Sequence, residues 1–224
     1  MISWYMYTRT IEHHREVVTR VLDVLRKYQL YLKAEKCTFE CTMVEYLGLV
    51  LSEGWVEMDP IKIAGVRDWL TPKNITEVQS FVSFVNFYRR FILEFSHVAS
   101  PLHRLTKKAE PWRQNEPEEA AFRALKSLVT LAPILVLPDQ GARFRVETDT
   151  SGYATRVILS QLRNDEKWHP IGFTSKSLSP AEHNYAIYDK ELLSVICGLE
   201  WRHILEGTKH TIEILNDHRN LMYF

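Results

Sequence analysis

The sequence has little cysteine, little glycine and proline, and no surplus of either charge. Its 224 residues include only 3 Cys, 8 Gly and 9 Pro, whereas 46% are hydrophobic. Three cysteines are too few for a disulfide framework, which favours a reducing, intracellular setting. The hydrophobic share excludes a disordered or low-complexity chain, and a chain of this length can form one large domain or two small ones.

Charge and hydropathy exclude further classes of protein. Lys plus Arg and Asp plus Glu both number 28, so a contact with nucleic acid must come from a local patch and not from the field of the whole chain. The sequence lacks an apolar run of the roughly 18 residues that a membrane span needs, and it lacks a secretory leader. We therefore expect no membrane partner and no secretion, and we place the protein in the cytoplasm or nucleus.

The spacing of Cys37 and Cys41 can put two thiolates on one helical face, which makes them a first candidate for a metal site. No second Cys or His pair follows at the spacing of a zinc finger. Buried or idle thiols are therefore the better interpretation of these two residues.

Hydrophobic periodicity and capping residues predict helices and a hairpin in the first part of the chain. Apolar residues at helical spacing predict a helix within residues 11–30. The alternating stretch Val44–Leu51, the turn at 52–54 and the stretch Trp55–Met58 predict a hairpin of two strands. Three further helices are predicted from their first residues, namely Asp59–Pro60, Asn74 with Glu77, and Asn115 with Glu118.

The pattern changes after Pro138, which predicts a domain boundary there. Phe144, Val146 and Thr148 alternate with charged residues, as in a strand that is buried on one face. The segments that follow predict two more antiparallel strands (Tyr153–Gln161 and Trp168–Thr174), a helix from the capping box Ser179–Glu182 to Gly207, and a fourth strand (His210–Leu215).

Three acidic residues lie at the ends of predicted strands or within the predicted helix. Asp149 ends the first strand, Glu191 lies in the helix, and Asp217 follows the fourth strand. Convergent carboxylate oxygens are the ligands that Mg²⁺ prefers, and two such ions promote cleavage of a phosphodiester. Acidic residues at such places are more often simply solvated, so the spacing alone leaves both interpretations open.

The motifs around these acids resemble a known family. They are Val146-Glu147-Thr148-Asp149-Thr150-Ser151-Gly152-Tyr153-Ala154, Tyr188-Asp189-Lys190-Glu191-Leu192-Leu193 and Asn216-Asp217-His218-Arg219-Asn220-Leu221. Upstream of them are Tyr46-Leu47-Gly48, Asn86-Phe87-Tyr88-Arg89-Arg90-Phe91 and Ala132-Pro133-Ile134-Leu135. In order and spacing, the motifs resemble those of the polyproteins of gypsy-type long-terminal-repeat retrotransposons, over nearly the whole chain.

The resemblance implies an α+β fold with three parts. Residues 1–58 would be the end of a reverse transcriptase palm with a primer-gripping hairpin, and residues 59–138 a helical thumb. Residues 139–224 would form a ribonuclease H-like domain, a mixed sheet with a packed helix, that is truncated at its carboxyl end. The parent enzyme copies RNA into DNA and hydrolyses the RNA of RNA/DNA hybrids with Mg²⁺, for which Mn²⁺ can substitute. Its partners are a hybrid or primer–template duplex and the rest of the polyprotein.

The resemblance also assigns roles to the acids. Asp149, Glu191 and Asp217 match three of the four acids that bind two Mg²⁺ ions in the family, and we expect their carboxyl groups within roughly 4 to 8 Å of one another. The fourth acid would follow the end of the sequence, and the paired polymerase aspartates would fall near residues 2 and 3 but are absent. We therefore expect no DNA synthesis, and weak or no hybrid cleavage, by this chain.

Three residues depart from the family pattern. Arg156 and Ser83 take the place of family glycines, and Leu70 takes the place of a proline. Because Arg156 lies beside Asp149 in the predicted strand pair, it can crowd the site or pair with its carboxylates in competition with Mg²⁺. The departures fit either a decaying element or lineage variation.

Four residues are candidates for contact with nucleic acid. The resemblance implies that Arg89 and Arg90 contact phosphates of a hybrid duplex, and that Tyr46 and Trp55 contact a primer strand. Basic pairs on helices are usually solvated and aromatic residues on hairpins usually pack, so the structural alternative stays open. Two functions thus remain: a Mg²⁺-dependent endonuclease, and an inert relic or an interaction module whose unfinished sheet exposes an edge.

Overall fold

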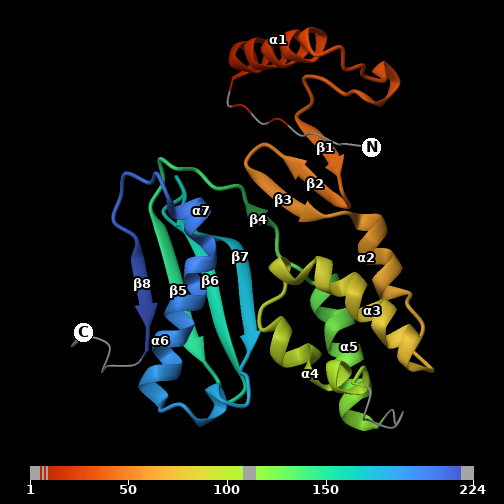
Figure 1. Cartoon of the computed structure of the whole chain (residues 1–224), viewed down its shortest axis with the longest axis vertical. Coiled ribbons are helices and arrows are strands. Elements are labelled where there is room, and N and C mark those ends of the chain that lie inside the picture. Colours follow the sequence, from red (N-terminus) through yellow and green to blue (C-terminus); the bar gives the residue numbers. More distant parts are fainter. Residues whose placement is uncertain (1–5, 7, 9, 108–114, 218–224) are drawn as a thin grey trace.

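The chain folds into two β-sheets and a group of helices (Figure 1). The computed structural model describes residues 6, 8, 10–107 and 115–217, and it confirms the α+β class expected from the sequence. Within these ranges, no helix is long and apolar enough to cross a bilayer. The first part contains α1 (Ile11–Lys27), η1 (Ala34–Lys36), β1 (Met43–Tyr46), β2 (Leu49–Ser52), β3 (Trp55–Met58), α2 (Pro60–Arg67), α3 (Ile75–Phe87), η2 (Arg89–Phe91), α4 (Phe95–Leu105) and α5 (Glu116–Thr130).

The first sheet has the strand order β1-β2-β3-β4 and is antiparallel throughout. Its last strand, β4 (Leu135–Val136), pairs with β3 only after the chain has passed through helices α2 to α5. The prediction of one strand over Val44–Leu51 is wrong. Leu47 and Gly48 have positive φ angles of 52° and 79°, and they form a tight hairpin turn between β1 and β2. Leucine rarely adopts this conformation, so only half of the turn is signalled by the sequence.

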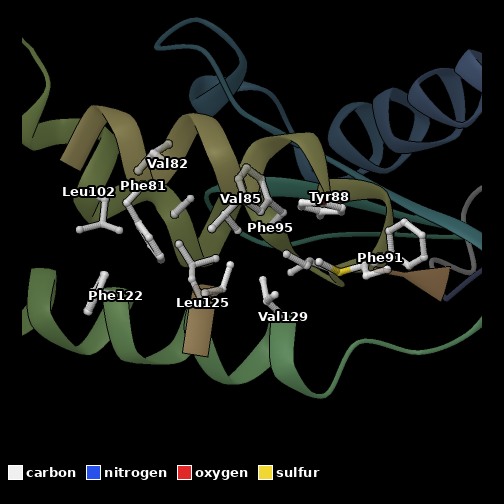
Figure 2. Close-up of a cluster of buried hydrophobic side chains, with 14 of the residues drawn as sticks. Phe81, Val82, Val85, Tyr88, Phe91, Phe95, Leu102, Phe122, Leu125 and Val129 are labelled. Carbon is white, nitrogen blue, oxygen red and sulfur yellow. The ribbon is translucent and has the colours of Figure 1, made fainter. Parts of the chain in front are cut away.

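Helices α3, α4 and α5 pack around one apolar core. Figure 2 shows the stripe of α3 that includes Phe81 and Val85 facing Leu125 and Val129 of α5. The predicted capping residues are present at the starts of α2, α3 and α5. The sequence pattern does not predict α4, because Pro101 lies inside it and proline usually ends a helix.

The second sheet carries the predicted antiparallel meander. Its strands are β5 (Phe144–Thr150), β6 (Ala154–Leu162), β7 (Trp168–Ser177) and β8 (Glu213–Asn216), in the order β7-β6-β5-β8. Strands β5, β6 and β7 pair antiparallel, whereas β8 pairs with β5 in parallel. Between β7 and β8 come η3 (Glu182–Asn184), α6 (Ile187–Gly198), η4 (Leu199–Trp201) and α7 (Arg202–Leu205). Figure 1 shows α6 crossing one face of this sheet.

The single helix predicted from Ser179 to Gly207 is wrong in its limits. The capping box forms, since the Ser179 N–H donates to Glu182 Oε2 at 2.6 Å, but it starts only the short turn η3. Helix α6 starts after this turn and lies very close to the sheet at its far end. A Cβ atom on Gly198 would lie 3.0 Å from Cγ1 of Val146, so glycine permits the close approach of α6 to β5.

The buried side chains form two clusters that divide within β4. Leu135 belongs to the first cluster, with residues of β2, β3 and helices α2 to α5, and Val136 belongs to the second, with the meander, α6 and α7. The division lies close to the boundary expected at residue 138. Val56 and Met58 of β3 share the first cluster with the helices that follow them. The limits 1–58, 59–138 and 139–224 stay a prediction.

The helical part of the chain, which contains α2 to α5 (residues 60–130), contacts the second sheet along β7. Arg89 Nη2 donates to the Ser175 carbonyl at 2.5 Å, and the Ser96 N–H donates to Ser175 Oγ at 2.8 Å. The guanidinium of Arg90 lies 4.8 Å from the centre of the Trp201 ring. These contacts fix the start of α4 against the sheet that carries the candidate acids.

Candidate metal centre

The three predicted acids converge at one edge of the second sheet. Asp149 lies near the carboxyl end of β5, Asp217 follows β8, and Glu191 lies on α6. Because β5 and β8 are parallel neighbours, their carboxyl ends meet, and α6 crosses beside them. One carboxylate oxygen from each acid lies within 4.8 Å of the others, which confirms the predicted convergence.

Burial differs among the three acids and follows from the element that carries each. Glu191 faces the sheet and is 5% exposed, Asp149 is half-buried, and Asp217 is exposed. The side-chain amide of Asn216 donates to Glu191 Oε2 at 2.9 Å and to Thr148 Oγ1 at 3.1 Å. Asn216 therefore orients the most buried carboxylate and links α6 to both strands. No role is predicted for Asn216 from the sequence, although its position directly before Asp217 is a usable signal.

A positive side chain lies inside the acidic cluster. Arg156 is opposite Asp149 in the β5–β6 register, and its Nη2 donates to Asp149 Oδ2 at 2.5 Å. Its Nη1 donates to Glu94 Oε1 at 3.0 Å. Of the two effects predicted for Arg156, crowding of the site or pairing with its carboxylates, the pairing is present, whereas the contact with Glu94 was not foreseen.

An open groove of about 310 Å³ lies beside the acids and is lined by Asp149, Arg156 and Asp217 among others. A smaller cavity of about 70 Å³ adjoins it on the side of α4, between Glu94, His97 and Arg156. Asp149 and Arg156 line both spaces. Asp149 and Asp217 are thus accessible from the groove, whereas Glu191 is buried and lines neither space.

The donor set fits a hard divalent cation. All three side chains offer oxygen, which suits Mg²⁺ or Mn²⁺ better than a thiolate-binding metal. In the described part of the chain, this is the one group of three or more His, Cys, Asp or Glu side chains that converges in this way. Cys37 and Cys41 do not belong to it, and both are free thiols.

The four nucleic-acid candidates all have partners within the chain. Arg89 donates to β7, and Arg90 stacks on Trp201, where burial lowers the pKa of its guanidinium from the ordinary value. Tyr46 is half-buried against the first cluster. The Trp55 ring lies 5.2 Å from the Arg163 guanidinium and remains 37% exposed. Their contact with nucleic acid stays a prediction.

The other two departures from the family pattern lie at the surface. Leu70 is 82% exposed after α2, and Ser83 is exposed on α3. Neither contacts the acids, so Arg156 is the departure that bears on the metal centre.

Comparison with known proteins relates the second sheet to a family. Residues 114–213 match the family described as RNase H-like domain found in reverse transcriptase. The chain is 34% identical over 218 residues to the Transposon Tf2-3 and Tf2-4 polyproteins of Schizosaccharomyces pombe (strain 972 / ATCC 24843). The match covers 97% of this chain and 16% of each polyprotein, so the chain spans a small part of the length of these relatives.

Solved structures share the fold. The foamy viral protease-reverse transcriptase dRH in complex with double-stranded DNA has a TM-score of 0.76 and 18% identity, over 97% of this chain and 39% of that chain. The foamy viral protease-reverse transcriptase in complex with RNA/DNA hybrid has a TM-score of 0.75 and 18% identity, over 96% of this chain and 30% of that chain.

Proposed function

We propose that Asp149, Glu191 and Asp217 bind divalent metal ions for the hydrolysis of RNA in an RNA/DNA hybrid. The proposal starts from the match of residues 114–213 to the RNase H-like domains found in reverse transcriptases. The convergence of the three carboxylates is the observation that carries this proposal. Mg²⁺ is the expected ion, at two positions, and Mn²⁺ is expected to substitute for it.

The residues of this chain have distinct parts in the proposed reaction. Asp149 and Asp217 come from neighbouring parallel strands, so the backbone fixes the distance between their carboxylates. Asn216 holds Glu191 through its 2.9 Å hydrogen bond, which limits the rotation of the buried carboxylate. Metal ions bound to such oxygens activate water and stabilise the leaving oxygen of a phosphodiester.

The ligand in this proposal is an RNA/DNA hybrid or a primer–template duplex. The likeness of fold to foamy viral proteins that hold double-stranded DNA or a hybrid supports it. The open groove beside Asp149 has room for a nucleic acid backbone. Arg89, Tyr46 and Trp55 remain candidates for further contacts, and Arg90 would act mainly by holding the helical part against Trp201.

The proposal extends to the rest of the chain. Residues 1–58 would be the end of the palm and residues 59–138 the thumb of a gypsy-type element, joined in the polyprotein to further domains. The 34% identity to Tf2 polyproteins over 97% of the chain supports this placement. Such a protein would act in the cytoplasm or nucleus.

The test is a hybrid with a label on either its RNA or its DNA strand, incubated with the chain and an excess of Mg²⁺ or Mn²⁺. We expect slow cleavage of the RNA strand alone, because Arg156 already binds the Asp149 carboxylate and competes there with the metal ion. The Asp149→Asn variant should lose this cleavage. Asp189→Asn is the matched control, since Asp189 is an exposed carboxylate on the same helix as Glu191 and lies outside the cluster.

Two results would contradict the proposal. Equal cleavage by the wild type and the Asp149→Asn variant would show that the acids do not hold the active metal. Binding of the hybrid without any cleavage, unchanged in the Asp149→Asn variant, would favour an interaction module in place of an enzyme.

A further inference from the structure

Two ion pairs that share Arg156 connect the helical part to the metal centre, one with Glu94 and one with Asp149. Arg156 Nη2 lies 2.5 Å from Asp149 Oδ2, and its Nη1 lies 3.0 Å from Glu94 Oε1. Asp149 belongs to the second sheet, whereas Glu94 directly precedes α4 and is 62 residues from Arg156 in the sequence. One guanidinium thus binds two carboxylates from different parts of the molecule.

The Arg156 guanidinium binds one carboxylate oxygen of Asp149, which is a proposed metal ligand. A guanidinium and a divalent ion repel each other, and they compete for the same carboxylate lone pairs. The Arg156 side chain therefore has to turn away from Asp149 when a metal ion binds there.

Glu94 offers the place to which Arg156 can turn. The Glu94 backbone has a left-handed φ of 57° at the N-cap of α4, and the next turn is anchored where Ser96 Oγ donates to the Ser175 carbonyl at 2.8 Å. The cavity of about 70 Å³ between Glu94, His97 and Arg156 gives the guanidinium room to move in this direction. The position of Glu94 is therefore fixed by contact between the helical part and β7.

We propose that Arg156 is a displaceable internal cation that sets the metal affinity of the centre, and that Glu94 holds it when a metal ion binds Asp149. The inference rests on the proposed function for the metal centre itself. Loss of the Arg156 charge removes a competitor, so it raises metal affinity. Loss of the Glu94 charge leaves the displaced guanidinium without a counter-charge, so it lowers metal affinity.

The test measures Mn²⁺ affinity by electron paramagnetic resonance of the free ion, on the whole chain and its variants. Since the paired side chains are 36% to 44% exposed, moderate effects are expected: about fivefold tighter binding for Arg156→Gln and about threefold weaker binding for Glu94→Gln. Arg143→Gln is the matched control, because Arg143 directly precedes β5, at the end of that strand that lies away from Asp149. It should leave the affinity unchanged.

The double variant Glu94→Gln/Arg156→Gln separates the proposed mechanism from a general effect of charge. If Glu94 acts through Arg156, the Glu94 substitution has no effect once Arg156 is replaced. Equal weakening in both backgrounds would overturn the role of Glu94. Arg156→Lys keeps the charge but cannot bind both carboxylates with one planar fork, so it should bind Mn²⁺ with intermediate affinity.

The variant Asp149→Asn distinguishes failure of this inference from failure of the metal centre. Loss of Mn²⁺ binding in Asp149→Asn together with unchanged affinity in Arg156→Gln would overturn the inference and leave the centre intact. Unchanged binding in Asp149→Asn, or no binding by any variant, would overturn both. Circular dichroism melting curves establish that each variant is folded.

Discussion

The two ends of β5 use the same pair of chemical groups in different ways. At the amino-terminal end, Arg143 and Arg145 both bind the single carboxylate of Glu213 on β8. Arg145 Nη2 lies 2.9 Å from Glu213 Oε2, and its guanidinium also stacks 3.9 Å from the centre of the Trp168 ring. Two positive charges thus meet one negative charge, and the cluster joins β8 to β5.

At the carboxyl end of the same strand, the balance of charge is reversed. The carboxylates of Asp149, Glu191 and Asp217 converge within 4.8 Å, and the guanidinium of Arg156 is shared between Asp149 and Glu94. A local excess of carboxylates is costly, and it is tolerated where a cation or a reaction needs it. The difference between the two ends fits a cluster that stabilises the sheet at the amino-terminal end and the proposed metal centre at the carboxyl end.

The largest effect on stability should come from disrupting the packing of α6 against β5. A Cβ on Gly198 would lie 3.0 Å from Val146 Cγ1 and 3.5 Å from Val157 Cγ1, so Gly198→Val should push α6 away from β5. We expect the free energy of unfolding to fall by about 2 to 3 kcal/mol in urea titrations. The control Gly65→Ala, on α2 with nothing within 4 Å of the new Cβ, should raise it by about 0.5 to 1 kcal/mol. A neutral Gly198→Val would refute the close approach of α6.

The next effect concerns the carboxyl end and has the opposite sign. Glu191 is 5% exposed beside two other carboxylates, so Glu191→Gln should stabilise the metal-free protein by about 1 kcal/mol. The glutamine carbonyl can still accept the hydrogen bond from Asn216. Urea titrations with a chelator measure the effect, and Glu191→Ala, which leaves Asn216 without this acceptor, should be less stable. A less stable Glu191→Gln would mean that the buried charge is already compensated.

The smallest effect concerns the amino-terminal end and depends on pH. The hydrogen bond from Arg145 is the main cause that lowers the pKa of Glu213 from its ordinary value. A carboxyl whose pKa is lower in the folded state stabilises the protein above its unfolded pKa of about 4.3, and it loses that contribution as the pH falls through its folded pKa. The melting temperature of the wild type should therefore exceed that of Glu213→Gln at neutral pH, and the difference should shrink below about pH 4.3. A difference that is independent of pH would argue against this ion pair.

Much of the fold follows from local signals in the sequence. The caps of α2, α3 and α5 and the meander of β5, β6 and β7 are predicted correctly, because capping residues and period-two alternation reflect contacts between near neighbours. The turn at Leu47 and the helix that contains Pro101 are missed, because tertiary packing overrides the local preferences of these residues. The start of α6 is missed for the same reason, since a good capping box forms but starts only a 3₁₀ turn.

The candidate site, too, is predicted from the sequence only in part. The convergence of Asp149, Glu191 and Asp217 follows from motifs and from the strand topology that they imply, and the pairing of Arg156 follows from strand register. The contact with Glu94 does not, because it depends on how the start of α4 packs against β7. A contact across 62 residues with no motif around it leaves no trace in a single sequence.

Paramagnetic broadening by Mn²⁺ in the nuclear magnetic resonance spectrum tests the contrast between the two ends of β5 most directly. At low Mn²⁺ concentration, amide signals of residues 148–150, 191 and 216 should broaden first. Those of residues 143–145, roughly 13 to 20 Å away along the strand, should broaden much less. Asp149→Asn should remove the broadening at the carboxyl end. Broadening centred on Glu213, or of equal strength at both ends of β5, would contradict a metal centre formed by Asp149, Glu191 and Asp217.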